Sequence, residues 1–130
     1  MKQTFAQAIS STLSEEMRRD DKIIVYGEDV AEMGGIFTAT RGIYEEFGAK
    51  RCISTPIAEG AIVGSAIGAA VTGLRPVVEL MYSDFQLVAF NELFHSLGKW
   101  KFMHGEAYKL PLVVRCAGGY SFGAGPEHSN

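Results

Sequence analysis

Four short runs of largely apolar residues, separated by helix-like stretches, constrain the fold of this chain more than any other feature. They read IIVY, RCIST, RPVVELMY and LPLVVRCA, and they lack the strict apolar–polar alternation of a half-exposed strand. Such strands suit a sheet whose two faces are both covered, and strands that alternate with helices pair in parallel. The sequence therefore predicts an α/β fold: a parallel sheet with helices on both faces.

The expected elements follow from periodicity and capping signals. Thr4 and Gln7 form a capping box before apolar residues at helical spacing, and Ser83 and Gln86 repeat this pattern before the last helix. We expect strands at 22–26, 51–55, 75–82 and 110–117, and helices at 4–19, 41–48, 58–72 and 84–102.

Composition excludes several classes of protein. The 130 residues carry a formal net charge of −3, which gives no electrostatic footprint for nucleic acid. The longest apolar run, 61–74, is too short to cross a bilayer, and the N-terminus resembles neither a signal nor a transit peptide. Cys52 and Cys116 lack metal-site spacing, which favours a reducing compartment. We expect a single cytoplasmic domain that binds neither nucleic acid nor a membrane.

The carboxyl ends of the strands are the place to look for a site, because ligands of parallel sheets bind there. The residues that follow the expected strands are two acids, a third acid, an apolar–aromatic pair and an imidazole: Glu28 and Asp29, Glu59, Met81 and Phe85, and His128. Each also has a plain structural explanation, since acids cap loops, Met81 and Phe85 suit a core, and a lone loop histidine is usually uninvolved. We expect these residues to face one edge.

Glu59 stands at the head of the small-residue stretch STPIAEGAIVGSAIGAA. An exposed acid there would only complement the helix dipole, whereas a half-buried one would tend to keep or share a proton. Gly60, Gly64 and Gly68 line one stripe of this helix. Helical glycines are unfavourable without close packing, either against the chain's own elements or against a second subunit; we favour the second subunit.

Several segments together resemble a known family. The segments GEDV, TPIAEGAIVGSAIGAA, GLRPVVELMYSDF, PLVVR and the glycine-rich tail with its HS pair span nearly all of the chain. In this order they resemble the amino-terminal, pyrimidine-binding domain of the β subunit of thiamine-diphosphate-dependent 2-oxo-acid dehydrogenases, which is related more distantly to transketolases. The resemblance implies that residues 1–130 form this domain. Because a carboxyl-terminal domain normally follows it, we expect this sequence to be part of a longer chain.

The resemblance also implies roles for particular residues. In this family the glutamate of the A-E-G segment, here Glu59, hydrogen bonds a ring nitrogen of the cofactor's aminopyrimidine and is catalytic. Phe85 matches the aromatic that stacks on the pyrimidine, Met81 an apolar wall, and Glu28 an acid near the amino side. His128 matches a histidine that handles substrate, although Glu127 before it departs from the family's pattern.

The partners follow from a missing motif. The family binds Mg²⁺ and diphosphate through a Gly-Asp-Gly segment on an α subunit, and this sequence has no such segment. The resemblance therefore implies an α2β2 heterotetramer, inactive without the α partner, in which a second β subunit packs against the Gly60/Gly64/Gly68 helix. A lipoyl acyltransferase would accept the acyl group.

The expected reaction is oxidative decarboxylation of a 2-oxo acid, with pyruvate as the first candidate substrate. Two alternatives remain open at this point. One is the ketol-transferring domain of a transketolase or a deoxyxylulose-phosphate synthase. The other is a non-catalytic module that only pairs with another chain.

Overall fold

A computed structural model describes residues 2–119 of the chain. In chain order the elements are α1 (Phe5–Arg19), β1 (Ile23–Glu28), α2 (Ile43–Phe47), β2 (Cys52–Thr55), α3 (Glu59–Val71), β3 (Arg75–Tyr82), η1 (Ser83–Leu87), η2 (Asn91–Leu97), α4 (Gly98–His104) and β4 (Val113–Ala117). The four strands form one sheet in the order β2-β1-β3-β4, and all three pairings are parallel. The predicted parallel α/β sheet is confirmed.

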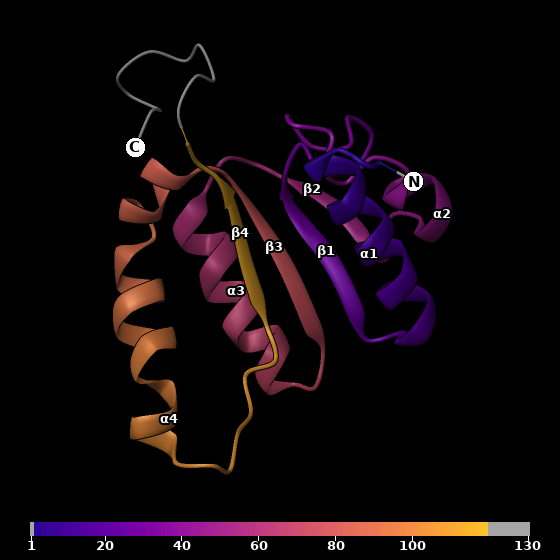
Figure 1. Ribbon diagram of the computed structural model, residues 1–130. Helices are drawn as coiled ribbons and strands as arrows, with labels where there is room; N and C mark the ends of the chain where they lie inside the picture. The colour runs from indigo at the N-terminus through magenta and orange to yellow at the C-terminus, as the bar shows by residue number, and fades with distance from the viewer. Residues whose placement is uncertain (1, 120–130) are drawn as a thin grey trace.

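Helices cover both faces, each over a separate core. On one face α3 packs over Tyr26, Val78 and Leu80, together with Ile62 and Val63 of the helix itself. On the other face α1 and α2 enclose a second cluster of buried side chains: Met17, Val25, Val30, Ala31, Ile43 and Cys52. Figure 1 shows α3 and α4 on one side of the sheet and α1 and α2 on the other. Because strand neighbours point to opposite faces, the apolar runs supply both cores at once.

The predicted capping box of the first helix is present. The Gln7 N–H donates to Thr4 Oγ1 at 3.2 Å, and the Thr4 N–H donates to Gln7 Oε1 at 2.9 Å. The second capping box was predicted wrongly, because the helix begins at Ser83 itself and its N-cap, Tyr82, makes no side-chain capping bond. Gln86 instead donates from Nε2 to Cys116 Sγ on β4.

The single helix predicted at 84–102 is three elements. A 3₁₀-helix, η1, comes first, a π-helix, η2, follows, and the α-helix α4 ends at His104. Apolar spacing shows which side of a helix is buried, but it hardly distinguishes 3₁₀-, α- and π-helices, whose backbone N–H groups bond to the third, fourth or fifth residue back along the chain. The sequence therefore predicted the extent of this segment better than its helix types.

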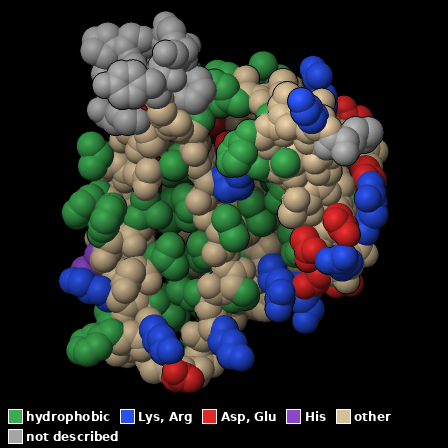
Figure 2. All heavy atoms as spheres, in the orientation of Figure 1, with side chains coloured by type: hydrophobic (Ala, Val, Ile, Leu, Met, Phe, Trp, Pro, Cys, Tyr) green, Lys and Arg blue, Asp and Glu red, His purple; other side chains and the backbone are tan. Residues whose placement is uncertain are grey.

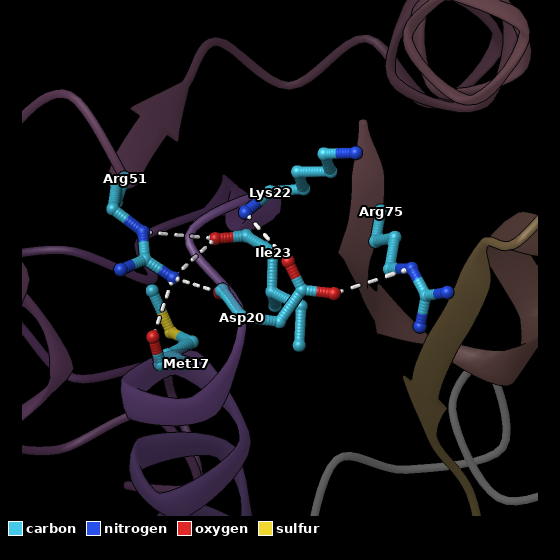
Figure 3. Close-up of polar contacts among 6 residues, drawn as sticks. All are labelled: Met17, Asp20, Lys22, Ile23, Arg51 and Arg75. Atoms are coloured by element: carbon cyan, nitrogen blue, oxygen red, sulfur yellow. Dashed lines mark hydrogen bonds and ion pairs between the residues drawn. The ribbon is translucent and has the colours of Figure 1, made fainter. Parts of the chain in front are cut away.

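Arg51 ties three elements together at the amino edge of the sheet. Its guanidinium donates to the backbone oxygens of Met17, Asp20 and Ile23 at 2.7–3.0 Å. Figure 3 shows this fan of bonds, with the Asp20 carboxylate reaching Arg75 at the start of β3. One side chain thus binds carbonyl groups at the end of α1 and in the turn into β1, where the Asp20 oxygen also accepts a 3.4 Å bond from the Ile23 N–H.

Arg51→Met should lower the free energy of unfolding by about 3 kcal/mol, because charge-assisted bonds to three carbonyls are lost while the apolar stem is kept. Urea unfolding followed by circular dichroism measures this. Arg19→Met is the matched control, since the ion pairs of Arg19 with Glu15 and Glu16 are exposed and should contribute less than about 1 kcal/mol. Equal losses in the two variants would contradict the role of Arg51.

On the face of the sheet that carries α1, helices cover β1 and β2 but leave β4 exposed. A cavity of about 290 Å³ lies between α1 and the β3–β4 pair, and the Glu79–Arg115 ion pair, 2.6 Å long, lines it. Val113 of β4 is half exposed, and Figure 2 shows hydrophobic side chains across the middle of this face with most charges at its margins. Within residues 2–119, no helix has the length and apolar character needed to cross a bilayer.

Candidate functional site

The carboxyl ends of three strands meet at one edge of the sheet. Glu28 ends β1, Thr55 ends β2 and Tyr82 ends β3. Figure 1 shows that α3 begins and β3 ends at this same edge, the upper one in that view. The chain topology therefore brings Glu59, the first residue of α3, to the edge where Glu28 lies.

The Glu28 carboxylate is buried and only half satisfied. Its side chain belongs to a residue only 3% exposed, and Oε2 accepts a 3.2 Å hydrogen bond from the Met81 N–H. Oε1 is also buried, and within the described part of the chain it has no hydrogen-bond partner. An orphaned carboxylate oxygen is costly inside a protein, so this atom marks the place where a donor belongs.

Gly27 sets the position of Glu28. Its φ is +148°, and a Cβ built there would lie 2.2 Å from the backbone oxygen of Glu79 on β3. Only glycine permits β1 and β3 to approach this closely. The residue that follows, Asp29, takes a left-handed conformation with φ of 54°, so the chain turns sharply just beyond the acid.

Glu59 is buried as well, at 5% exposure, so the expected burial of this acid is confirmed. At this low exposure Glu59 is not the exposed helix-start acid of the plain structural explanation.

The charge of Glu59 acts on Glu28. Burial raises the pKa of the Glu28 carboxyl above its ordinary value, the charge of Glu59 raises this pKa further, and the Met81 N–H opposes both. Glu28 therefore holds a proton more readily than an exposed glutamate does.

Met81 lies beside Glu28, to which its backbone N–H donates. Met81 and Phe85 are both half buried, and neither belongs to either core cluster. The Phe85 ring meets Tyr82 edge to face at 6.0 Å, and Tyr82 meets Phe37 at 5.7 Å. An aromatic row thus runs from the loop after β1, past the end of β3, into η1.

Other residues of the chain lie beside part of the Gly60/Gly64/Gly68 stripe on α3. A Cβ on Gly60 or Gly64 would contact the Glu92 side chain of η2 at 3.4 and 3.6 Å, whereas nothing lies within 4 Å at Gly68. Glu92 thus lies at ordinary van der Waals distance from the first two positions, and Gly68 is open.

The remaining predictions for the site stand differently. His128 lies outside the described residues. Among the described residues, no group of three or more His, Cys, Asp and Glu side chains could hold a metal ion. Sequence reasoning missed Thr55, whose buried Oγ1 also lacks a partner. The rule that selected Glu28, a polar residue at the carboxyl end of a parallel strand, would have found it.

The whole chain, residues 1–130, matches the sequence profile of the family described as transketolase, pyrimidine binding domain. The chain belongs to this family. Its members carry the parallel α/β fold described above, and the expected membership is confirmed.

Individual relatives are similar over most of the chain. It is 45% identical over 123 residues to the pyruvate dehydrogenase E1 component subunit beta of Chaetosphaeridium globosum, covering 95% of this chain and 38% of that protein. It is 43% identical over 129 residues to the subunit of that name from Rickettsia conorii, covering 99% and 40%. It is 42% identical over 112 residues to the 2-oxoisovalerate dehydrogenase subunit beta of Bacillus subtilis, covering 86% and 34%. The chain thus spans less than half the length of these relatives.

Proposed function

We propose that this chain is the pyrimidine-binding part of a β subunit of a 2-oxo-acid dehydrogenase that uses thiamine diphosphate. The observation that carries the proposal is the pair of buried acids, Glu28 and Glu59, at the carboxyl edge of a pyrimidine-binding fold. The relatives described above are β subunits of such dehydrogenases, which favours oxidative decarboxylation over ketol transfer.

The residues present fit an aminopyrimidine ring. Such a ring offers an amino group that donates two hydrogen bonds and a ring nitrogen that can share a proton. Glu28 Oε1 is a buried acceptor without a donor, and the Glu59 carboxylate is a buried acid that can share a proton. Donors on the ligand thus correspond to unmet acceptors on the chain.

Thiamine diphosphate would supply the carbanion chemistry that releases carbon dioxide from the 2-oxo acid. The chain itself would bind the aminopyrimidine ring and position protons on it. Glu59 would share its proton with the ring nitrogen, an exchange that burial strengthens. Phe85 would stack on the ring and Met81 would close the pocket, while the Met81 N–H holds Glu28 in place. His128 is proposed to handle substrate.

The proposal includes an α subunit that holds Mg²⁺ and the diphosphate, giving an α2β2 heterotetramer that passes its acyl group to a lipoyl acyltransferase. The missing Gly-Asp-Gly segment supports a divided site. A cytoplasmic location is proposed as well, and the two free thiols, Cys52 and Cys116, support it.

The test is reconstitution of the full-length β chain with its α partner, thiamine diphosphate and Mg²⁺. Turnover of pyruvate and of 2-oxoisovalerate is followed with an artificial electron acceptor. Activity that needs both chains and the cofactor supports the proposal, and the preferred acid identifies the substrate. A loaded complex that decarboxylates neither acid contradicts it.

Contact with a second β subunit through α3 is also proposed, and Gly68 is the sharpest probe of it. Gly68→Leu should leave the fold intact, because open space surrounds that position and leucine favours helix more than glycine does. It should nevertheless weaken association of β chains at least about tenfold by overpacking the interface. Sedimentation velocity measures the association, with exposed Gly105→Asn as the control. Unchanged association would assign the stripe to packing within the chain.

A further inference from the structure

Two buried polar atoms without partners lie on neighbouring strands at the same edge. They are Oε1 of Glu28, at the end of β1, and Oγ1 of Thr55, at the end of β2. The two residues are paired in register, Glu28 opposite Thr55. Side chains of register partners in a parallel pair point to the same face, so both point to the α3 side, two residues beyond Tyr26 and Ile53.

Movement of the two side chains can bring Glu28 Oε1 and Thr55 Oγ1 within hydrogen-bonding distance. Adjacent strands lie about 4.8 Å apart, and a glutamate side chain has three torsions with which to approach its neighbour. A hydroxyl is suited to this position because it can donate to an ionised carboxylate and its hydrogen turns freely.

We propose that Thr55 is a positioning residue whose hydroxyl donates to the unpartnered Oε1 of Glu28 and holds that carboxyl in its ionised form beside Glu59. This inference rests on the proposed function, in which Glu59 shares a proton with the aminopyrimidine. A negative charge held on Glu28 favours keeping that proton on Glu59, so Thr55 decides which of the two acids carries it.

The charges around Glu28 explain why a neutral donor is needed. The charges of Glu59 on α3, Asp29 in the following loop and Glu79 on the opposite face of β3 all disfavour its ionised form. The Met81 N–H at Oε2 opposes them. A carboxylate that accepts two or three hydrogen bonds remains ionised even where burial disfavours charge. Thr55 would supply the second of these bonds, and because a carboxylate oxygen has two lone pairs, Oε1 can also accept from the amino group of the ligand.

The test compares Thr55→Val, which keeps the shape but removes the hydroxyl, with Thr55→Ser, which keeps the hydroxyl. Both are made in the full-length β chain assembled with its α partner. Burial already raises the pKa of Glu28, and loss of a donor raises it further. The folded state then holds this proton more tightly than the unfolded chain does, so the variant loses more stability as pH rises through the raised pKa. Thr55→Val should therefore melt about 2–4 °C below Thr55→Ser at pH 8 and within about 1 °C of it at pH 5. In a Glu28→Gln background the pH-dependent difference should vanish.

A packing role for Thr55 would give the same difference at both pH values, and that outcome overturns the proposal. Affinity for thiamine diphosphate, measured by calorimetry at pH 7, should fall about tenfold in Thr55→Val and less than about twofold in Thr55→Ser. If Thr55→Val binds and melts like wild type while Glu59→Gln is inactive, the inference fails and the proposed function stands. If Glu59→Gln is also fully active, the proposed function itself fails.

Discussion

Glu59→Gln should lower turnover of the assembled dehydrogenase by about 10²–10⁴-fold while leaving assembly intact. Glutamine matches the size and hydrogen-bonding reach of glutamate but cannot release or accept a proton at this position. Because Glu59 is buried at the head of α3, no solvent group replaces it easily. Steady-state kinetics with saturating cofactor measures the loss, and sedimentation checks assembly.

The control is Glu106→Gln, an identical chemical change at an exposed residue that pairs with Lys101. This control should keep turnover within about twofold. Near-normal activity of Glu59→Gln would remove the proton-sharing role and with it the central part of the proposed mechanism.

Gly27→Ala should destabilise the fold by at least about 4 kcal/mol. The added Cβ would lie 2.2 Å from the backbone oxygen of Glu79 and 2.9 Å from its nitrogen, so no flexible side chain can yield to it. The two central strands must separate instead, which breaks their hydrogen bonds and displaces Glu28. Urea unfolding followed by circular dichroism measures this loss.

Gly42→Ala separates backbone strain from the clash. Gly42 also has positive φ, +85°, but nothing lies within 4 Å of a Cβ built there. This variant should lose only about 1–2 kcal/mol. If both variants were equally stable, the close approach of β1 to β3 would not be a constraint on the fold.

Sequence patterns predicted most of the architecture, because each rule used depends on local physics. The capping box at Thr4 fixed the start of α1, and the apolar run at 75–82 coincides with β3. β1 extends two residues beyond the predicted end at Tyr26, since Gly27 and Glu28 pair with β2, a long-range contact that no local pattern reveals. β4 begins at Val113 rather than 110, and Pro111, which has no N–H, lies in the excluded part.

Sequence patterns predicted where the two acids of the candidate site lie, but not their contacts. Topology alone placed Glu28 and Glu59 at one edge, and the structure brings their charges together. That Glu28 Oε1 lacks a partner, that Thr55 faces the same side, and that Glu92 fills the space beside Gly60 all depend on packing between segments distant in sequence. The resemblance to a family assigned roles that periodicity could not.

The Arg51 fan has a practical consequence for anyone who wishes to modify this domain. It lies at the amino end of β1, and Glu28 lies at the other end, five residues along the strand, or roughly 17 Å. At physiological ionic strength a surface charge is screened within about 8 Å. Exposed charges near that end, such as Lys22, can therefore be exchanged to improve solubility or to attach the protein to a support without altering the protonation of the distant acids.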